Sequence, residues 1–460
     1  MNRTTPALVI AAPASGSGKT TVATGLMGAL RRAGHRVAAF KVGPDFIDPG
    51  YHALATGAPG RNLDPVLVGD HLIGPLYGHG SSAADIAVVE GVMGLFDGRI
   101  RPPATGPATG STAQVAGLLN APVLLVVDAR GQSQSIAALL HGFSTFDAHT
   151  RLAGVILNRI GSARHEQVLR EAAESVGVPV LGAIPRMDDL TVPSRHLGLV
   201  TATEHGQRAD AAVRAMTDLV ARHVDLSLVM ALADASVSAP AWQPADAVGA
   251  QPRPACAPVI AVAAGMAFTF SYAEHEELLS AAGADIVRFD PLVDPLPARA
   301  SGLVLPGGFP EEYPAQLADN VALRRGVADL ARHGAVYAEC AGLTYLMTEL
   351  DGHPMCDVLH GAARFTPRLT LGYRDAVAVA DSVVHTAGDR VVGHEFHRTT
   401  VEFTVDYQSA WMYRLPDGAV IRDGAASGGV HAAYLHTHPA AQPASVARFV
   451  AHAARSKLAG

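Results

Sequence analysis

Apolar and polar positions along the first half of the chain follow a repeating order. Short apolar runs are separated by longer stretches with helical spacing or composition. Strands that alternate with helices in this way form parallel βαβ units, so we expect a doubly wound parallel sheet. The predicted strands are residues 37–40, 86–89, 123–127, 152–157 and 178–184, and the predicted helices are 20–32, 111–120, 133–141 and 164–176.

A stretch rich in proline and alanine interrupts this order and has no periodicity, so we expect a linker at residues 236–257. After it the alternation starts again. From about residue 360 the pattern becomes more strand-like. We therefore expect two α/β domains, residues 1–235 and 258–460. The predicted strands of the second are 259–263, 286–289, 302–305 and 336–338, and its predicted helices are 272–282 and 343–350.

Composition narrows the class of protein. The 460 residues are 49% hydrophobic and 17% charged, which is typical of a globular protein, and the net charge of −7 offers no basic surface for nucleic acid. No uncharged apolar run reaches about 18 residues and no leader precedes Ala7, so we expect neither a membrane span nor a secreted protein. Cys256, Cys340 and Cys356 form no C-x-x-C pair, which favours a reducing, cytoplasmic location.

The clearest motif follows the apolar run 8–12 and reads ASGSGKTT over residues 14–21. A strand that enters a glycine-rich turn and then a helix presents backbone N–H groups and a positive helix end to a phosphate. The lysine of this motif reaches the terminal phosphates, and the following hydroxyl binds Mg²⁺. Pro13 stands where the usual pattern has its first glycine, and a simple tight connection is the alternative interpretation. We expect a nucleoside triphosphate site formed by Gly16, Ser17, Gly18, Lys19, Thr20 and Thr21.

Two acidic segments come directly after predicted strands, at the sheet edge where ligands bind. The first contains Asp45 and Asp48, and the second contains Glu90 and Asp97. Mg²⁺ is usually held by one or two carboxylates beside phosphate oxygens, so Asp45 and Glu90 are predicted to complete a metal site with Thr20. The three aspartates also lie beside proline or glycine, where Asp often serves only a turn. That alternative is weaker for Glu90, which follows four apolar residues.

Two later strand ends also carry polar side chains. Asp128 ends the strand at 123–127, where it either serves the site or caps the next helix. Asn158 ends the strand at 152–157, where its amide either reads a purine edge or forms a turn. Both interpretations stay open for each residue.

The second half contains a cysteine at a sharp strand-to-helix junction. Such a turn exposes the Cys340 side chain beside a helix N-terminus, which lowers the pKa of a thiol. A thiolate needs a base, and His436 and His438 of the segment YLHTH are the two candidates. Gly307 and Gly308 follow another strand, so their N–H groups are predicted to form an oxyanion hole. The alternative is that Cys340 is an inert core residue.

The segment GHEFH at residues 393–397 is a weak match to a metal motif. Zinc-binding helices need two histidines four positions apart, whereas His394 and His397 are three apart. We therefore expect a substrate contact or a polar cluster there, and no metal.

In combination, eight segments are specific to one family: APASGSGKTT, KVGPDFIDPGYH, VVEGVMGLFDG, VPSRHLGL (192–199), LPGGFPEEY, AECAGLTYL, GHEFH and YLHTH. Over nearly its whole length the chain resembles the cobyrinic acid a,c-diamide synthases, which include the hydrogenobyrinic acid a,c-diamide synthases of the aerobic route to vitamin B12. The resemblance implies a P-loop NTPase fold like that of dethiobiotin synthetase, followed by a flavodoxin-like class I glutamine amidotransferase domain.

For the first domain the resemblance implies a site for ATP and Mg²⁺. The phosphate loop and the two metal carboxylates named above would hold ATP·Mg²⁺, and Asn158 would contact the adenine. Asp48 and Asp97 would lie beside the carboxylates of the tetrapyrrole substrate.

For the second domain the resemblance implies that Cys340 is the glutaminase nucleophile and His436 its base. The wider amidotransferase class has a Glu two residues after this His, but here His438 stands in that place. His436 must therefore be oriented by something else, or be held less firmly. On chemistry alone the choice between the two histidines stays open, and the family pattern favours His436.

The implied activity is ATP-dependent amidation of the a- and c-side-chain carboxylates of cobyrinate or hydrogenobyrinate, through acyl phosphates, with glutamine or ammonia as nitrogen donor. This makes the chain a glutamine-hydrolysing carbon–nitrogen ligase. Two alternatives remain: the related cobyric acid synthase, and a P-loop ATPase switch or partitioning protein, which would have no use for Cys340. The sequence leaves open the natural substrate, the order of amidation, the ammonia path and the oligomeric state, for which a homodimer is one candidate.

Overall fold

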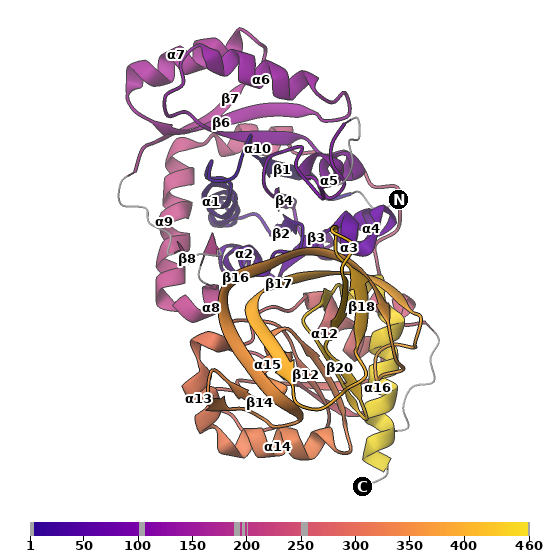
Figure 1. The fold of residues 1–460 in the computed structure, drawn as a ribbon. Helices are drawn as coiled ribbons and strands as arrows, with labels where there is room; N and C mark the ends of the chain where they lie inside the picture. Colours follow the sequence, from indigo (N-terminus) through magenta and orange to yellow (C-terminus); the bar gives the residue numbers. More distant parts are fainter. Residues whose placement is uncertain are drawn as a thin grey trace. The chain divides into compact units, whose positions relative to one another are not determined.

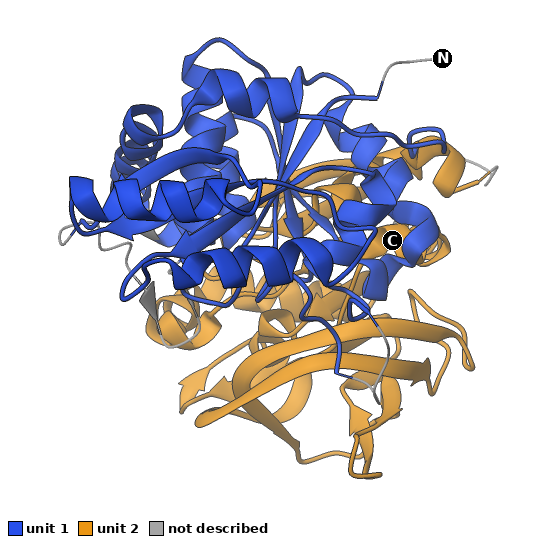
Figure 2. Cartoon of the chain, turned by 90° about the horizontal axis from the view of Figure 1, so that it is seen from above, with its two compact units in different colours: residues 1–242 blue, residues 243–460 orange. Residues whose placement is uncertain are grey.

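The computed structural model describes residues 4–100, 106–187, 194–195, 198–199, 201–249 and 256–458. The chain divides into two compact units, residues 1–242 and 243–460 (Figures 1 and 2). Of the segment VPSRHLGL (192–199), only the paired strands β8 (Ser194–Arg195) and β9 (Gly198–Leu199) are described, and the rest lies outside the described residues.

Unit 1 is a doubly wound α/β fold, as the alternation of strands and helices predicts. Its main sheet contains β1 (Ala7–Ala11), β2 (Val37–Val42), β3 (Gly60–Leu63), β4 (Ile86–Glu90), β5 (Val123–Asp128), β6 (Leu152–Ile160) and β7 (Val180–Pro185). These strands pair in parallel in the order β3-β2-β4-β1-β5-β6-β7. β1 and β4 are buried along their whole length, because helices lie on both faces of the sheet (Figure 2).

Some helices of unit 1 begin directly after a residue whose side chain caps them. Ser111 and Ser162 precede α5 and α7 and accept backbone N–H groups of the first turn. In the sheet's layers α1, α2 and α9 contact one another, α4 contacts α5, and α6 contacts α7. The helices are α1 (Lys19–Arg32), α2 (Asp48–Thr56), α3 (Pro65–Val68), α4 (Asp70–Ser81), α5 (Thr112–Leu119), α6 (Ser135–Thr145), α7 (Ala163–Glu174), α8 (Ala202–His205), α9 (Gln207–His223) and α10 (Leu226–Leu232).

The chain runs along unit 1 as far as Trp242, inside the segment that the sequence predicts as a linker. Ser236 donates its N–H to Leu119 O, and Trp242 donates its N–H to Pro75 O. The Trp242 side chain is buried. A short helix, α11 (Pro244–Ala247), then begins unit 2.

Unit 2 contains a mostly parallel sheet of the flavodoxin-like kind. Its strands are β10 (Val259–Ala263), β11 (Asp285–Phe289), β12 (Ala300–Leu305), β13 (Ala335–Glu339), β20 (Ala425–Ser427) and β21 (Val430–Ala433). They pair in the order β11-β10-β12-β13-β21-β20, and only the last pair is antiparallel. The helices are α12 (Ala273–Ala281), α13 (Pro314–Asp319), α14 (Val321–Ala331), α15 (Ala341–Leu346) and α16 (Pro443–Leu458), with 3₁₀ turns η1 (Pro310–Glu312) and η2 (Pro439–Ala441). The predicted fold class of both halves is confirmed.

A second sheet in unit 2 is built on one long antiparallel pair, β16 (Leu359–Ala378) and β17 (Arg390–Phe403). The prediction of strands beyond residue 360 is therefore confirmed. The predicted helix at 343–350 is wrong in its second half: residues 347–350 form a strand that pairs with β16, so long-range pairing overrides the local helical preference. The other strands are β14 (Met347–Leu350), β15 (His353–Pro354), β18 (Trp411–Arg414), β19 (Val420–Asp423) and β22 (His436–Thr437).

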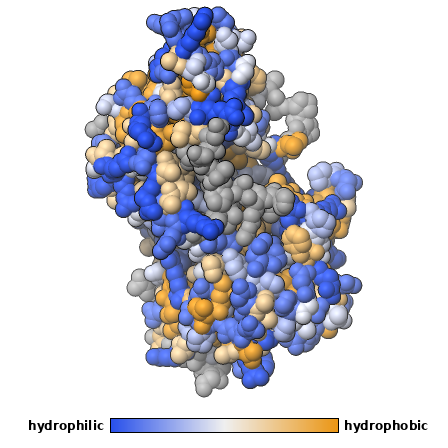
Figure 3. Space-filling model, turned by 90° about the vertical axis from the view of Figure 1, so that its left-hand side faces the viewer, coloured by the Kyte–Doolittle hydropathy of each residue, from blue (hydrophilic) through white to orange (hydrophobic). Residues whose placement is uncertain are grey.

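On the face shown in Figure 3, hydrophilic residues predominate and hydrophobic ones are scattered among them. Within the described residues, no helix combines the length and the apolar character that crossing a bilayer requires.

Candidate active sites

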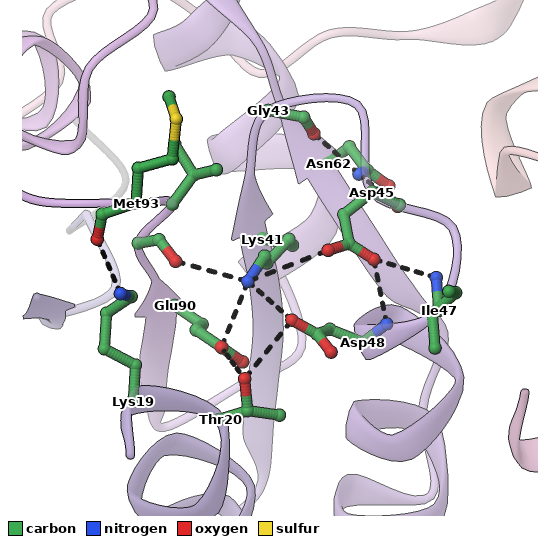
Figure 4. A network of polar contacts seen from close by, with 12 residues as sticks. Lys19, Thr20, Lys41, Gly43, Asp45, Ile47, Asp48, Asn62, Glu90 and Met93 are labelled. Carbon is green, nitrogen blue, oxygen red and sulfur yellow. Dashed lines mark hydrogen bonds and ion pairs between the residues drawn. The ribbon is translucent and has the colours of Figure 1, made fainter. Parts of the chain in front are cut away.

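The phosphate loop lies between β1 and α1, where the sequence predicts it. Gly18 precedes α1 with a φ of 100°, which favours glycine. The Lys19 ammonium donates to Met93 O at 2.5 Å, from the loop that follows β4 (Figure 4). Burial lowers the pKa of Lys19, and the nearby positive charge of Lys41 lowers it further. A phosphate at the loop would give this buried ammonium a stronger partner than a carbonyl.

The ends of β5 and β6 hold the phosphate loop from the side. The Asn158 amide donates to Ser17 O at 2.9 Å, and the Arg159 guanidinium donates to Gly16 O at 2.9 Å. Asp128 pairs with Arg159 at 2.5 Å and does not cap α6. Asn158 thus lies at the predicted nucleotide site, and its contact with the base stays a prediction.

A cluster of charged groups lies directly beside the loop (Figure 4). The Thr20 hydroxyl donates to Glu90 Oε1 at 2.6 Å and lies 3.4 Å from Asp48 Oδ2. The Lys41 ammonium lies between the same two carboxylates, 2.6 Å from Asp48 and 3.0 Å from Glu90. Glu90 Oε2 also contacts His52 Nε2 at 2.6 Å. The ends of β2 and β4 and the start of α1 and α2 therefore bring their polar groups to one point.

The charges in this cluster depend on one another. Burial alone would lower the pKa of Lys41, but the charges of Asp48 and Glu90 outweigh it and raise that pKa. Burial would likewise raise the pKa of Glu90, but Lys41, His52 and the Thr20 hydroxyl outweigh it and hold that pKa below its usual value. For Asp48, burial and the charge of Asp45 dominate and raise the pKa. Glu90 is therefore the firmly ionised carboxylate of the pair.

Asp45 has a different place from the one the sequence suggests. Its carboxylate accepts the N–H groups of Ile47 and Asp48, at 2.8 and 2.9 Å, at the start of α2. It lies 3.9 Å from the Lys41 ammonium. Among the residues named for the metal or the substrate, Asp48 is the one that joins Thr20 and Glu90.

The donor atoms of this cluster suit Mg²⁺. They are carboxylate and hydroxyl oxygens, and the place they surround already accepts the cationic head of Lys41. Within the described ranges, His, Cys, Asp and Glu side chains form no group of three or more placed to hold a metal alone.

Asp97, the other predicted substrate contact, lies in the loop after β4. Its carboxylate accepts the N–H of Gly94 at 2.9 Å and faces solvent on its other side. It contributes to the electrostatic surroundings of Lys19. Its contact with a substrate stays a prediction.

In unit 2, Cys340 lies on a strained turn between β13 and α15. Its φ of 49° and ψ of −97° are rarely adopted by residues other than glycine, as expected of a nucleophile placed at a sharp elbow. The close approach of α15 to β12 requires Gly342, since a Cβ there would lie 2.3 Å from Leu305 O. The Sγ atom lies 3.8 Å from Phe396 O of β17, inside the segment GHEFH.

The Cys340 side chain is a protonated thiol and not a thiolate. The sequence predicts that the helix N-terminus lowers the pKa of Cys340, but burial, aided by the negative charge of Glu311, raises it well above the usual value. The N–H groups of Gly308 and Ala341 act in the opposite direction, which places both donors at the sulfur. A thiol in this setting must pass its proton to a base as it reacts.

The dipeptide Gly307-Gly308 contacts both His436 and Cys340. A Cβ at Gly307 would lie 2.3 Å from Cε1 of His436, so the Cε1 edge of the imidazole contacts this glycine. The next N–H, of Gly308, faces Cys340. His438 instead accepts the N–H of Ala440 through Nδ1 at 3.3 Å, and so caps η2. The geometry therefore favours His436 as the base, as the family pattern does.

The segment GHEFH forms part of β17 and is not a helix. Glu395 is buried and bound by Arg374 at 2.5 Å and Tyr413 at 2.7 Å. His397 lies 3.4 Å from Glu395 and stacks on Tyr434. This is a polar cluster, one of the two expectations for the segment.

Two charged residues in these sites were not singled out by the sequence. Lys41 belongs to the segment KVGPD, where the sequence directs attention to the carboxylates that follow the strand. Only the fold shows that Lys41 is buried. Glu339 directly precedes Cys340, and only the fold brings it within 3.6 Å of His436 Nδ1.

Two family models match the chain, one in each unit. The model of the CobQ/CobB/MinD/ParA nucleotide binding domain matches residues 8–200, and that of the CobB/CobQ-like glutamine amidotransferase domain matches residues 259–444. Fold and sites together define a glutamine-hydrolysing carbon–nitrogen ligase that joins a nucleotide-binding unit to an amidotransferase unit. The second match also argues against an ATPase switch.

Relatives with known names cover nearly the whole chain. The hydrogenobyrinate a,c-diamide synthase of Mycobacterium bovis is 66% identical over 449 residues, which are 97% of this chain and 98% of the relative. That of Streptomyces coelicolor is 54% identical over 477 residues, 97% of each chain. The cobyrinate a,c-diamide synthase of Synechococcus sp. is 38% identical over 454 residues, 96% of this chain and 97% of the relative. The chain belongs to this family of a,c-diamide synthases.

Among solved structures, chloroplast FtsY from Physcomitrella patens covers 41% of this chain and 61% of its own. With a TM-score of 0.31 and 17% identity, the likeness is too small to bear on the fold.

The buried cluster gives a prediction for Lys41→Met. Removing the ammonium leaves Glu90 buried without its main counter-charge, so burial then raises the pKa of Glu90 above that of the unfolded chain. A folded state that holds Glu90 with a raised pKa loses stability as pH rises through that pKa, because the carboxyl must then ionise without its partner. The free energy of unfolding of the variant should therefore fall further below that of the wild type at pH 8 than at pH 5. Urea denaturation should show a loss of about 3–5 kcal/mol at pH 8.

The matched control is Arg36→Met, which breaks the exposed pair with Asp85 at the start of β2. It should change stability little at either pH. An equal loss for Lys41→Met at both pH values would show that Lys41 does not act by balancing carboxylate charge.

Proposed function

We propose that the chain amidates the a- and c-side-chain carboxylates of hydrogenobyrinate, with ATP activating each carboxylate and glutamine supplying the nitrogen. The observation that carries the proposal is that each unit contains one of the two sites the reaction needs. Unit 1 has a phosphate loop with Thr20, Asp48 and Glu90, and unit 2 has Cys340 with His436. Relatives at 52–66% identity are named for hydrogenobyrinate, which favours it over cobyrinate. A cytoplasmic location and a homodimer stay predictions.

Unit 1 would solve the leaving-group problem of amide formation. A carboxylate cannot lose hydroxide readily, so it first attacks the γ-phosphoryl group of ATP and displaces ADP. Ammonia then attacks the acyl carbon and phosphate leaves. In this account Lys19 exchanges the Met93 carbonyl for the phosphate oxygens, and the loop N–H groups bind the same charge.

Thr20, Asp48 and Glu90 would hold Mg²⁺ beside the phosphates, where the ion would neutralise part of their charge. Asp48 takes the place in this set that the sequence predicts for Asp45. Asp45 then supports it by accepting the N–H groups of Ile47 and Asp48 at the start of α2. Asp97 and Asn158 keep their predicted contacts, with the substrate and with the adenine.

Unit 2 would release ammonia from glutamine. Cys340 Sγ attacks the carboxamide carbon while His436 takes the thiol proton. The N–H of Gly308, one of the two predicted donors, would bind the developing oxyanion, and the N–H of Ala341 would take the place predicted for that of Gly307. His436 then returns the proton to the departing ammonia. Water hydrolyses the remaining thioester to glutamate. Because burial raises the pKa of Cys340, His436 must act during the attack and not before it.

The two sites are separable by mutation. Cys340→Ala should lower glutamine-dependent amidation by about a thousandfold or more and leave amidation with added ammonium salts unchanged, because only the nitrogen source is lost. Product mass spectrometry with each nitrogen source measures both rates. Cys356→Ala, which removes another buried thiol, is the control and should keep both activities. Loss of both activities in Cys340→Ala would contradict the assigned role.

Lys19→Ala should have the opposite pattern. Without the ammonium the transferring phosphoryl group loses a stabilising charge, so amidation should fall about 100- to 1000-fold with either nitrogen source. The same assay measures it, with Arg32→Ala at the far end of α1 as the control. Normal amidation by Lys19→Ala with ammonium would rule out the phosphate-loop assignment.

A further inference from the structure

We propose that Glu339 is the positioning residue of the glutaminase site and replaces the Glu that related enzymes have two residues after the histidine. Its Oε2 atom lies 3.6 Å from His436 Nδ1. This is an ion-pair distance rather than a formed hydrogen bond, and contacts of this kind often shorten when substrate binds. The proposal rests on the roles proposed above for Cys340 and His436.

Glu339 is held in place by its neighbours. Its Oε1 atom accepts the Thr437 N–H at 3.0 Å, the Thr437 hydroxyl at 3.2 Å and the hydroxyl of Tyr337. The side chain is 12% exposed. Oε1 is thus bound by three donors from the two elements that carry the site, β13 and β22, and Oε2 is the oxygen that faces the imidazole.

The carboxylate of Glu339 is ionised. Burial alone would raise its pKa, but His436, Tyr337 and the Thr437 N–H outweigh burial and hold the pKa below its usual value. His436 is fully buried between Gly307 and this carboxylate, so a negative charge there acts in a low-dielectric setting.

The other titratable groups near the imidazole do not supply this charge. His394 of β17 faces His436, and burial lowers its pKa to about 3, so it is neutral at neutral pH. Cys340 is a thiol, since burial raises its pKa. His438, at the position of the usual Glu, points its Nδ1 to the Ala440 N–H.

An ionised carboxylate accepts hydrogen bonds and cannot donate them, so Glu339 requires the imidazole proton to be on Nδ1. Nε2 is then the ring atom that accepts a proton. When His436 takes the thiol proton, the same carboxylate stabilises the imidazolium. Glu339 therefore sets the tautomer and the orientation of His436, as the acidic member of a catalytic triad does.

Glu339→Gln tests this directly. The amide keeps the acceptor for Thr437 and Tyr337 but turns an NH₂ group toward His436, which favours the wrong tautomer. The glutamine-dependent kcat should fall about 100-fold, with the KM for glutamine within about twofold. The acid limb of the glutaminase pH profile should move to lower pH, because the imidazolium has lost its counter-charge. Ammonia-dependent amidation should be unchanged.

Glu349→Gln removes a glutamate that pairs with Arg364 at the surface of unit 2, and it should leave every readout unchanged. A normal glutamine-dependent kcat in Glu339→Gln, or a fall with the acid limb in place, would overturn the proposal. If Glu339→Gln also loses the ammonia-dependent reaction, the test is repeated with Glu339→Asp. This variant keeps the negative charge but moves the carboxylate away from His436 by the length of one methylene. A loss of about tenfold confined to glutamine-dependent kcat supports the proposal, and no loss contradicts it.

Cys340→Ala in the same assay distinguishes failure of the nucleophile assignment from failure of the role proposed for Glu339. If that variant kept glutamine-dependent amidation, the nucleophile itself would be wrong and the proposed function of unit 2 would fail. If only Glu339→Gln behaves as wild type, the site stands and the positioning role of Glu339 is wrong.

Discussion

Both units depend on one property of parallel sheets: the strands end together, so polar groups that follow them gather on one edge. In unit 1, the ends of β1, β2 and β4 bring the phosphate loop, Lys41 and Glu90 to the same point. In unit 2, the ends of β12 and β13 place Gly308 beside Cys340. Helices cover the faces of such sheets, so this edge is the place that remains for chemistry.

The same edge makes charge balance the main constraint on each site. Glu90 is fully buried and stays ionised because Lys41 and His52 surround it. His436 is equally buried and faces the carboxylate of Glu339. A buried charge without a partner costs several kcal/mol, so these pairs fix both the fold around the site and its protonation state. In the proposed mechanism the carboxylates of unit 1 would hold a cation beside the phosphates of ATP, and the carboxylate of unit 2 would orient a base.

Patterns among neighbouring residues predicted those structural features that depend on neighbouring residues alone. The phosphate loop, the elbow at Cys340 and the alternation of strands and helices all follow from neighbouring residues. Pairings between distant segments were not predictable: β14 formed where a helix was expected, and Asp48 rather than Asp45 lies against Thr20. The thiol pKa of Cys340 had the wrong direction, because burial depends on the whole core and not on the adjacent helix. For the same reason Lys41 and Glu339 gave no signal.

In the proposed mechanism the phosphate loop activates a carboxylate as an acyl phosphate. The decisive measurement follows oxygen from hydrogenobyrinate labelled with ¹⁸O in its carboxylates during a reaction with ATP and glutamine. An acyl phosphate transfers one carboxylate oxygen to the phosphate that leaves, so the account predicts one ¹⁸O in inorganic phosphate for each amide formed. Amide formation with no ¹⁸O in the phosphate would contradict it.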